Sequence, residues 1–362
     1  MTPFPTTHAR NIPARVDAEL TTFLDRKIVE LGALQAGEAA HLIKDCVLEG
    51  GKRLQGMWCY WGWQAGGRED CPEIIKVGAA LELFHWAALI VDDVFDRSDT
   101  RRGLPALHRR LADLHLEQGW HGDPDHYGLV QTLCLTDIAW AWSDELMFAS
   151  GMDPRLLATR RLPNDLLRSE VWLGQYLDMA ERARRTPSLD KAMNVALLKT
   201  ARSNTMYPLQ FGAELANAPA EVISAFKRFG EAVGEAYQLQ DDLLGVFGDE
   251  RLTGKSSTDD FRNGCMTILL SWAMEHATPA QLKVFERHHG DPDLDGTGAA
   301  ALRAVVEETG ARAKIEAMLE DRRAYAVSLL DEAPIADEVR RALTELAVAD
   351  PVRAGMAAAA VA

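Results

Sequence analysis

The sequence predicts an all-α protein, and three observations support this prediction. Runs of β-branched residues are few, whereas stretches rich in alanine, leucine, glutamate and arginine extend over most of the 362 residues. Hydrophobic residues make up 47% of the chain, which is ample for a large core. Residues 79–95 follow the apolar periodicity of a helix without a glycine or proline break.

Charge and cysteine content narrow the class of protein. The net charge is −15 and no basic stripe occurs, which argues against a nucleic-acid-binding protein. The five cysteines are odd in number and form no CxxC pair, so we expect reduced thiols in a cytoplasmic protein. No run of 18 apolar residues and no signal-peptide pattern is visible, so we expect a soluble protein with neither membrane insertion nor a targeting segment.

Taken in order, the chain begins with a Pro/Thr-rich stretch, residues 1–13, which predicts a flexible arm. Residues 17–48 follow the pattern of two amphipathic helices. A glycine pair at 50–51 then breaks the helix and precedes Lys52 and Arg53. Glycines before basic side chains let the backbone approach a phosphate closely, so this loop is a candidate anion site.

The helix over 79–95 carries the strongest site prediction. Near its end lie three carboxylates, those of Asp92, Asp93 and Asp96. The first and last are four residues apart and share one helix face. Carboxylates at the end of an apolar helix repel one another and are costly to desolvate unless a cation joins them. Oxygen ligands at this density suit Mg²⁺, and the guanidiniums of Arg101 and Arg102 follow closely, as a metal-bridged diphosphate requires.

A second acidic cluster strengthens this interpretation. Further helices are predicted over residues 129–149, 191–206, 226–244 and 299–330. The helix over 226–244 carries Asp241 and Asp242 near its end, with Lys255 downstream. A solvated acidic helix end would explain one such cluster, but two clusters that each end an apolar helix and precede basic residues rarely arise by chance. A protein this acidic must also bring cations to an anionic diphosphate, so metal dependence is expected on charge grounds.

These motifs resemble those of the trans-isoprenyl diphosphate synthases, the polyprenyl synthetase family, and most closely its actinobacterial geranylgeranyl/farnesyl diphosphate synthase branch. The resemblance extends from about residue 50 to residue 353. It rests on GGKRL (Gly50–Leu54), DDVFDRSDTRRGLPALH (Asp92–His108), GQYLD (Gly174–Asp178), Lys199-Thr200 and YQLQDDLLGVFGDERLTGKSSTDD (Tyr237–Asp260). It implies the isoprenoid synthase fold, a single-domain bundle of long helices around a central cavity over residues 14–353, with a flexible tail at 354–362.

The resemblance also implies an activity. A member of this family is a Mg²⁺-dependent prenyltransferase that condenses an allylic prenyl diphosphate with isopentenyl diphosphate, giving a longer all-E polyprenyl diphosphate, here of farnesyl to geranylgeranyl length (C15–C20). We expect a cytoplasmic homodimer that binds neither nucleic acid nor membrane. Three Mg²⁺ ions per active site would be held by aspartates of both clusters, namely Asp92, Asp93, Asp96, Asp241 and Asp242. The residues expected to act in catalysis are Asp92, Asp93, Lys199 and Lys255.

The resemblance assigns the substrate contacts to three sets of residues. The allylic diphosphate would bind Arg101, Lys199, Thr200, Gln238 and Lys255. Isopentenyl diphosphate would bind Lys52, Arg53, Gln55, His85 and Arg102. The pocket that limits chain length would be lined by Ala87, Ala88 and Trp140, with Trp86 or Trp142 as alternative closing residues. Spacing places Gln175 and Asp178, three apart, on one helix face, which would either face the cationic pocket or be an ordinary polar helix face.

The chain departs from the family pattern in three places, and these keep other functions open. Gln55 and Gly56 replace the arginine and proline of the usual GGKRxRP motif, Gly245 replaces the third aspartate of the second cluster, and Cys265 replaces the lysine of the usual GKxT motif. One alternative is a class I terpene synthase or an unusual prenyltransferase that ionises an allylic diphosphate without ordinary use of isopentenyl diphosphate. A less favoured alternative is a non-catalytic partner subunit. Product length and a linear or cyclic outcome do not follow from these residues.

Overall fold

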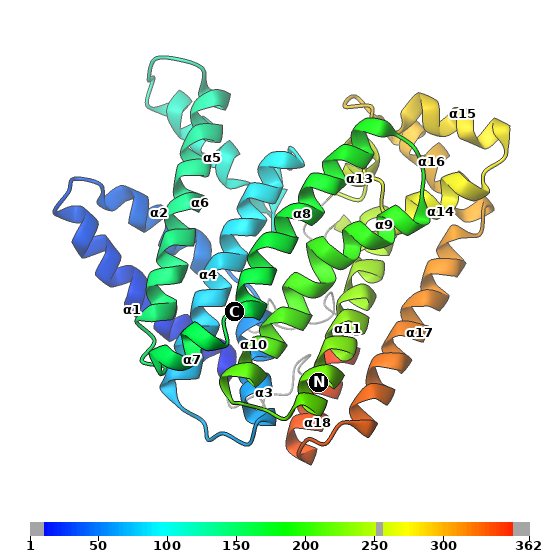
Figure 1. Ribbon diagram of the computed structural model, residues 1–362. Coiled ribbons are helices and arrows are strands. Elements are labelled where there is room, and N and C mark those ends of the chain that lie inside the picture. The colour runs from blue at the N-terminus through cyan, green and yellow to red at the C-terminus, as the bar shows by residue number, and fades with distance from the viewer. Residues whose placement is uncertain (1–10, 251–255, 350–362) are drawn as a thin grey trace. The chain divides into compact units, whose positions relative to one another are not determined.

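The computed structural model describes residues 11–250 and 256–349, and the regular secondary structure of this part consists of helices (Figure 1) and two strands of two residues each. The all-α prediction is therefore confirmed. The chain divides into two compact units. We call the unit of residues 11–162 and 208–219 the N-terminal unit, and the unit of residues 163–207 and 220–349 the C-terminal unit, both without the undescribed positions.

The N-terminal unit holds the first aspartate cluster. Its elements are α1 (Ile12–Gly32), α2 (Gly37–Leu48), α3 (Leu54–Ala65), α4 (Pro72–Phe95), β1 (Thr100–Arg101), β2 (Leu104–Pro105), α5 (Leu107–Glu117), α6 (Pro124–Phe148), α7 (Pro154–Thr159) and most of α10 (Tyr207–Leu215). The described end of the predicted arm is already helical, since α1 begins at Ile12, with a proline in its first turn. The predicted tail at 354–362 lies outside the described residues, and the domain boundaries at 14 and 353 stay predictions.

Helix α4 is the central element of this unit and contains the predicted helix over 79–95. It packs against α1, α3 and α6. By length and hydropathy alone, α4 could cross a membrane, but 78% of its most apolar window is buried inside the protein, as in a core helix. At the crossing of α3 and α4 a Cβ on Gly78 would lie 3.0 Å from the Gly56 Cα, so these two glycines allow the helices to touch backbone to backbone. That contact fixes the start of α3 against α4.

The C-terminal unit is built around α11 (Ala220–Phe247), which packs against α17 (Ala311–Glu332). Its other elements are α8 (Leu162–Arg184), α9 (Leu189–Ala196), η1 (Leu197–Met206), α13 (Asp259–Arg262), α14 (Ile268–His276), α15 (Pro279–His288), α16 (Gly296–Glu308) and α18 (Asp337–Val348). Its core joins apolar residues of α9, α11, α14, α16 and α17. The predicted helix over 226–244 lies within α11. The predicted helix over 299–330 is two helices, because Gly310 adopts the left-handed conformation that ends α16 and begins α17.

The predicted helix over 191–206 also differs from the structure. It is α-helical only to Ala196, and residues 197–206 form the π-helix η1. This segment lies in backbone contact with both neighbours: a Cβ on Gly174 of α8 would lie 2.4 Å from the Lys199 nitrogen, and one on Gly234 of α11 would lie 2.3 Å from the Ala201 Cα. π-Helical turns are rare and frequently occur at functional sites. Lys199 and Thr200 lie in this π-helix, whose turns are wider than those of an α-helix.

Candidate active site

The first aspartate cluster lies at the C-terminal end of α4, as predicted, but its members have different surroundings. Asp93 is 1% exposed, and each of its carboxylate oxygens accepts a hydrogen bond of 2.9 Å from Arg101 Nε. Asp92 keeps 26% of its side chain exposed and lies 3.9 Å from Arg101 Nη2. Burial alone would lower the pKa of Arg101, but the Asp93 carboxylate raises it. Asp93 therefore holds a guanidinium, while Asp92 and the partly exposed Asp96 share the neighbouring face.

A short hairpin directs the two arginines that follow. Strands β1 and β2 pair antiparallel around Arg102 and Gly103, whose φ angles of 54° and 78° match the two-residue turn that hairpins favour. Arg102 Nη1 donates to the carbonyl oxygens of Glu49 at 3.1 Å and Gly50 at 2.8 Å. Burial lowers the pKa of Arg102, and the nearby positive charges of Arg53 and Arg101 lower it further. The hairpin thus turns Arg101 to the aspartates and Arg102 to the glycine pair.

The glycine loop brings a second guanidinium to the same place. A Cβ on Gly51, whose φ is 118°, would lie 3.0 Å from Arg53 Nη1 and 3.2 Å from Arg102 Nη2. Arg53 is 4% exposed, and it donates from Nε to Asp17 Oδ1 at 2.6 Å and from Nη2 to the Val47 carbonyl at 2.9 Å. Arg53 and Arg102 thus meet at the Gly51 backbone, and both are fixed by the protein before any ligand arrives.

The other residues predicted for isopentenyl diphosphate belong to the same unit. Lys52 is partly exposed, whereas Gln55 is only 3% exposed. Burial, followed by the positive charges of Arg102, Arg101 and Arg53, lowers the pKa of His85 to about 3. His85 is therefore neutral near pH 7, and a neutral imidazole can donate one hydrogen bond to an anion.

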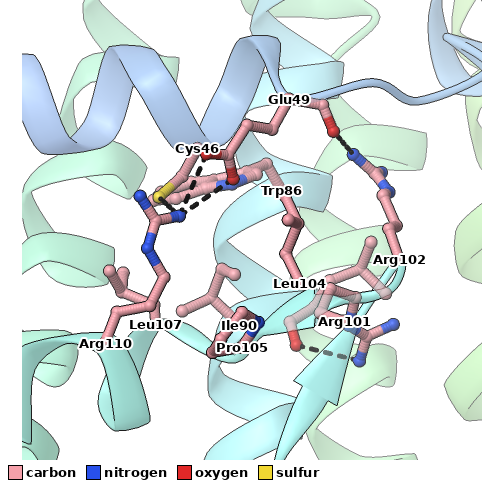
Figure 2. A pocket seen from close by; sticks show the side chains of 11 residues that line it. Cys46, Glu49, Trp86, Ile90, Arg101, Arg102, Leu104, Pro105, Leu107 and Arg110 are labelled. Carbon is pink, nitrogen blue, oxygen red and sulfur yellow. Dashed lines mark hydrogen bonds and ion pairs between the residues drawn. The ribbon is translucent and has the colours of Figure 1, made fainter. Parts of the chain in front are cut away.

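A pocket behind the hairpin explains how these arginines are held (Figure 2). It is lined by apolar side chains of α4, β2 and α5, and by Arg101, Arg102 and Arg110. Arg110 Nη1 donates to the Glu49 carboxylate at 2.9 Å and to Cys46 Sγ at 3.4 Å (Figure 2). This pair ties the end of α2 to α5, and the Glu49 carbonyl accepts from Arg102. Glu49 therefore supports the position of Arg102 from outside the glycine loop.

The predicted chain-length residues lie on α4 and α6. Ala87 is fully buried and Ala88 is partly buried. One turn before Ala88, the Phe84 ring lies 6.3 Å from the Trp140 ring with a tilt of 32°. Of the alternative residues, Trp86 lines the pocket behind the hairpin, and Trp142 is buried edge-on against Phe23 of α1. Trp140, together with Phe84, is therefore the better candidate for the closing aromatic.

In the C-terminal unit, the GQYLD motif and Lys199 form one network. Asp178 is 8% exposed and accepts from Lys199 Nζ at 2.9 Å, from Arg182 Nε at 2.9 Å and from Arg182 Nη2 at 2.7 Å. Burial would raise the pKa of Asp178, but the charges of Lys199 and Arg182 lower it overall. This carboxylate is held ionised between two cations and orients the lysine predicted for the allylic diphosphate.

Gln175 differs from its neighbour Asp178. Its side chain is 5% exposed, and within the described part of the chain neither its amide nitrogen nor its amide oxygen has a hydrogen-bond partner. A buried amide without partners is costly, so its presence points to a ligand or an ordered water. The adjacent Gly174 makes the backbone contact with Lys199 described above. The motif therefore combines a close helix contact with an amide available for binding.

The second aspartate cluster also divides into an inner and an outer carboxylate. Asp242 is 2% exposed, and its Oδ2 accepts the N–H groups of Ile268 at 2.8 Å and Leu269 at 3.3 Å at the start of α14. Gln238 Nε2 donates to its Oδ1 at 2.7 Å. Burial raises the pKa of Asp242 to about 7 despite these donors. Asp241 is exposed, so it is the member of the pair that faces solvent.

The Asp260 side chain packs closely against Gly245, the residue that replaces the third aspartate of the second cluster. A Cβ on Gly245 would lie 2.2 Å from Asp260 Oδ2, so a side chain at this position and the Asp260 carboxylate exclude each other. The usual third aspartate of the cluster is absent, and a carboxylate from α13 lies at that part of α11 instead.

These residues fit magnesium through the chemistry of their donors. Mg²⁺ is typically bound by one or two carboxylates, with water and substrate phosphate completing its shell. The described residues contain no group of three or more His, Cys, Asp or Glu side chains arranged as a metal site. In the N-terminal unit Asp92 and Asp96, and in the C-terminal unit Asp241, are at least partly exposed near helix ends, so each unit offers one or two carboxylates of this kind. Asp93 and Asp242 are instead committed to protein donors. Lys255 lies outside the described residues.

Sequence reasoning missed several supporting residues. Glu49, Glu82 and Asp260 all contact or neighbour the site residues, but none of them is among the residues that the motifs assign to the site. Glu82 did leave a signal, because it is the single charged residue in the apolar stretch from Val77 to Val91. A lone carboxylate in such a stretch is rarely buried without a partner. Arg182 left the weaker signal of an i, i+4 pair with Asp178.

The protein is helical, and each of its two units carries an aspartate cluster near the end of an apolar helix. The model of the family "Polyprenyl synthetase" matches residues 38–305. The chain belongs to the polyprenyl synthetase family. It is therefore an enzyme of the prenyltransferase class and has the isoprenoid synthase fold. Members of this family make polyprenyl diphosphates and use magnesium.

Individual relatives differ in the product that their names give. The structure of a geranylgeranyl pyrophosphate synthase from Corynebacterium glutamicum, complexed with isoprenyl diphosphate and magnesium, matches with a TM-score of 0.90 and 32% identity, over 93% of this chain and 97% of that chain. The geranylfarnesyl diphosphate synthase of Aeropyrum pernix is 29% identical over 67% of this chain and 71% of its own length. A (2E,6E)-farnesyl diphosphate synthase of Mycobacterium tuberculosis is 28% identical over 64% of this chain and 58% of its own length. Family membership thus leaves chain length open.

Proposed function

We propose that this protein condenses an allylic prenyl diphosphate with isopentenyl diphosphate and releases an all-E product of farnesyl to geranylgeranyl length. The observation that carries the proposal is the meeting of Arg53 and Arg102 at the Gly51 backbone, next to a neutral His85. An enzyme that only ionises an allylic diphosphate needs one diphosphate site. This cationic loop, in addition to the aspartates and Arg101, supports a second diphosphate and hence a second substrate.

The chain's own residues have distinct tasks in this reaction. Asp92, Asp96 and Asp241 would hold magnesium, which when bound stabilises the negative charge of the departing diphosphate. Arg101 and Lys199, kept in place by Asp93 and Asp178, neutralise the charge that remains. The C–O bond of the allylic substrate breaks, the double bond of isopentenyl diphosphate attacks the allylic carbon, and a proton leaves to the released diphosphate. No serine or cysteine nucleophile is needed.

Product analysis tests the proposal directly. Purified protein would be incubated with magnesium and geranyl, farnesyl or geranylgeranyl diphosphate, each with and without isopentenyl diphosphate, and the products identified by mass spectrometry. We expect elongated prenyl diphosphates of C15–C20 only when isopentenyl diphosphate is present. Hydrocarbon or alcohol formed from the allylic substrate alone, at a rate matching elongation, would favour a terpene synthase instead. The observation that favours this second function is that Gln55 is buried and adds no guanidinium to the glycine loop.

The proposal includes a homodimer in the cytoplasm. Helix α8 exposes Leu173, Tyr176 and Met179 at 55%, 71% and 41%, and an exposed apolar row of this kind supports a covered surface in the assembly. None of the five cysteines, all of which lie in the described residues, forms a disulfide, which suits a reducing compartment. Analytical ultracentrifugation of the wild type and of Tyr176→Glu tests the assembly. We expect a dimer for the first and a shift towards monomer for the second.

A further inference from the structure

Glu82 is a buried carboxylate that the reaction described above does not use. It lies on α4, ten residues before Asp92, and is 4% exposed. Burial raises its pKa, and the charges of Arg53 and Arg102 together with the backbone N–H groups of Gly56 and Gln55 oppose this shift. A carboxylate in an apolar helix is costly unless its neighbours compensate it, so the identity of these neighbours indicates what Glu82 does.

The first neighbour is the start of helix α3. Glu82 Oε1 accepts the N–H of Gly56 at 3.0 Å. The residue in the N-cap position of α3 is Arg53, which has a φ of 52° and makes no side-chain cap, since its guanidinium donates to Asp17 and Val47 instead. The first N–H groups of a helix require an acceptor from elsewhere when the N-cap side chain provides none. Glu82, on the adjacent helix α4, provides this acceptor for the N–H of Gly56. It therefore holds the first turn of α3, which directly follows the loop that carries Gly51 and Arg53.

The second set of neighbours is the guanidiniums themselves. Arg53 and Arg102 converge at Gly51, and Arg101 adds a third positive charge nearby. Like charges at this density repel one another, and Arg102 has only backbone carbonyls as hydrogen-bond acceptors in the contacts described above. The buried Glu82 carboxylate interacts electrostatically with both Arg53 and Arg102. One carboxylate therefore both caps α3 and offsets part of the positive charge at the glycine loop.

We propose that Glu82 is a positioning residue for the diphosphate of isopentenyl diphosphate: it caps α3 and offsets the charges of Arg53 and Arg102, so that both guanidiniums stay at the glycine loop. It acts through these residues and does not touch the substrate. The inference rests on the proposed function, because it assigns the loop to the second substrate.

The test compares Glu82→Ala and Glu82→Gln with the wild type in steady-state kinetics, with each substrate varied. Glu82→Ala removes both the cap and the charge, so we expect the KM for isopentenyl diphosphate to rise by about tenfold or more, while kcat and the allylic KM change by less than about threefold. Glu82→Gln retains an oxygen that can accept from Gly56, so we expect it to recover part of the loss, leaving an increase of about threefold.

Asp295→Ala is a matched control. Asp295 also caps a helix by accepting the N–H of a glycine at the third helical position, Gly298 of α16, at 2.7 Å, but it lies in the C-terminal unit. The control should lower the melting temperature as the loss of a cap does, and leave the KM for isopentenyl diphosphate unchanged. If Glu82→Ala lowered stability but changed no KM, or changed both KM values and kcat together, Glu82 would be merely structural and the proposal would be overturned.

Calorimetry with isopentenyl diphosphate and with inorganic diphosphate, without allylic substrate, separates this proposal from the proposed function. If the wild type does not elongate, the proposed function fails, yet weaker binding of inorganic diphosphate to Glu82→Gln would still support the positioning role. Should Glu82→Ala not fold, Glu82→Gln decides alone. Affinity for both ligands that is unchanged or tighter in Glu82→Gln would overturn the proposal.

Discussion

Asp92 and Asp93 are adjacent in the chain, yet the structure separates their roles. Consecutive helical residues point about 100° apart, so one carboxylate reaches solvent while the other turns inward. Asp93 is 1% exposed and paired with Arg101, which is itself largely buried. Loss of the Asp93 carboxylate would leave a buried guanidinium without its counter-ion, so Asp93 contributes to the stability of the fold as well as to the site.

We therefore expect Asp93→Asn to lower the free energy of unfolding by about 3–5 kcal/mol, the range for breaking a buried ion pair. Asp92→Asn should change it by less than about 0.5 kcal/mol, since its side chain is partly exposed. Both variants should reduce turnover by about two orders of magnitude. Urea unfolding without magnesium, combined with turnover at saturating substrate, measures both quantities. Equal unfolding free energies for the two variants would refute the assigned division of roles.

His289 gives a residue-scale prediction for pH dependence. It is 5% exposed, and its Nε2 lies 3.1 Å from the Cys265 carbonyl oxygen. Burial lowers the pKa of His289 to about 4, the carbonyl opposes this, and the charges of Arg185 and Arg182 add to it. An unfolded histidine has a pKa of about 6.5, so between these values the unfolded state binds a proton that the folded state does not. The stability contributed by the neutral imidazole is therefore lost as the pH falls.

From about pH 7 to about pH 5 this one group should lower the free energy of unfolding by about 2 kcal/mol. His289→Gln keeps a hydrogen-bonding side chain but does not titrate, so it should lose less stability than the wild type over the same interval. Urea unfolding of both proteins at the two pH values gives the comparison. If the wild type and the variant lost the same amount, the histidine would not be the group responsible.

At the scale of elements, α4 and α6 define the candidate for chain-length control. Ala88 lies one turn before Asp92, and Phe84 lies one turn earlier still, against Trp140. The small side chains of Ala87 and Ala88 lie near the aspartates, and the Phe84–Trp140 pair lies one turn further from them. This order fits a tail pocket that has space next to the aspartates and is closed by the two aromatic rings. Trp142 is turned away from this pair and packs against Phe23 instead.

Ala88→Phe should shorten the product by at least one isoprene unit, because its ring would occupy the space of the growing tail. Phe84→Ala should lengthen the product, because it removes one ring of the closing pair. Trp142→Phe is the control: it should reduce stability without altering the product, since this side chain is buried elsewhere. Mass spectrometry of the products from farnesyl diphosphate measures all three. An unchanged distribution in both test variants would place the closing residues elsewhere.

Element boundaries show what local pattern can and cannot predict. The helix over 79–95 and the helix over 226–244 were predictable, because apolar periodicity is a local signal and both helices are long. The π-helix at 197–206 was not, since its hydrogen-bond pattern depends on close approaches by Gly174 and Gly234 from other helices. The glycines are visible in the sequence, but their partners are set only by tertiary packing.

The same limit applies to the site as a whole. Sequence motifs located both aspartate clusters, the glycine loop and the arginine pair, because each combines a helix end with a compositional signal. They did not distinguish the inner from the outer aspartates, since burial depends on which helix lies opposite. Asp242 caps α14 and Glu82 caps α3, and both contacts join residues 26 positions apart. Long-range caps of this kind leave no periodic trace.

For the whole molecule, the net charge of −15 makes cation and diphosphate binding interdependent. Two of the arginines and lysines predicted for the allylic diphosphate already pair with carboxylates, Arg101 with Asp93 and Lys199 with Asp178. An allylic diphosphate would therefore find few uncompensated positive charges among these residues and would depend on metal held by the outer aspartates. A ligand that binds only the folded state stabilises it in proportion to the logarithm of its concentration relative to Kd. Stabilisation by diphosphate at the aspartate clusters should thus require magnesium.

We expect magnesium and inorganic diphosphate together to raise the melting temperature by more than the sum of their separate effects, and EDTA to abolish both this gain and turnover. Asp241→Asn should lose most of the gain. Asp321→Asn, which removes one negative charge from an exposed position of α17, should retain it. Thermal unfolding of the three proteins with each ligand alone and with both provides the measurement. Because the two variants have the same net charge, a loss in both would indicate a general charge effect, and an equal gain with EDTA present would contradict metal-dependent binding altogether.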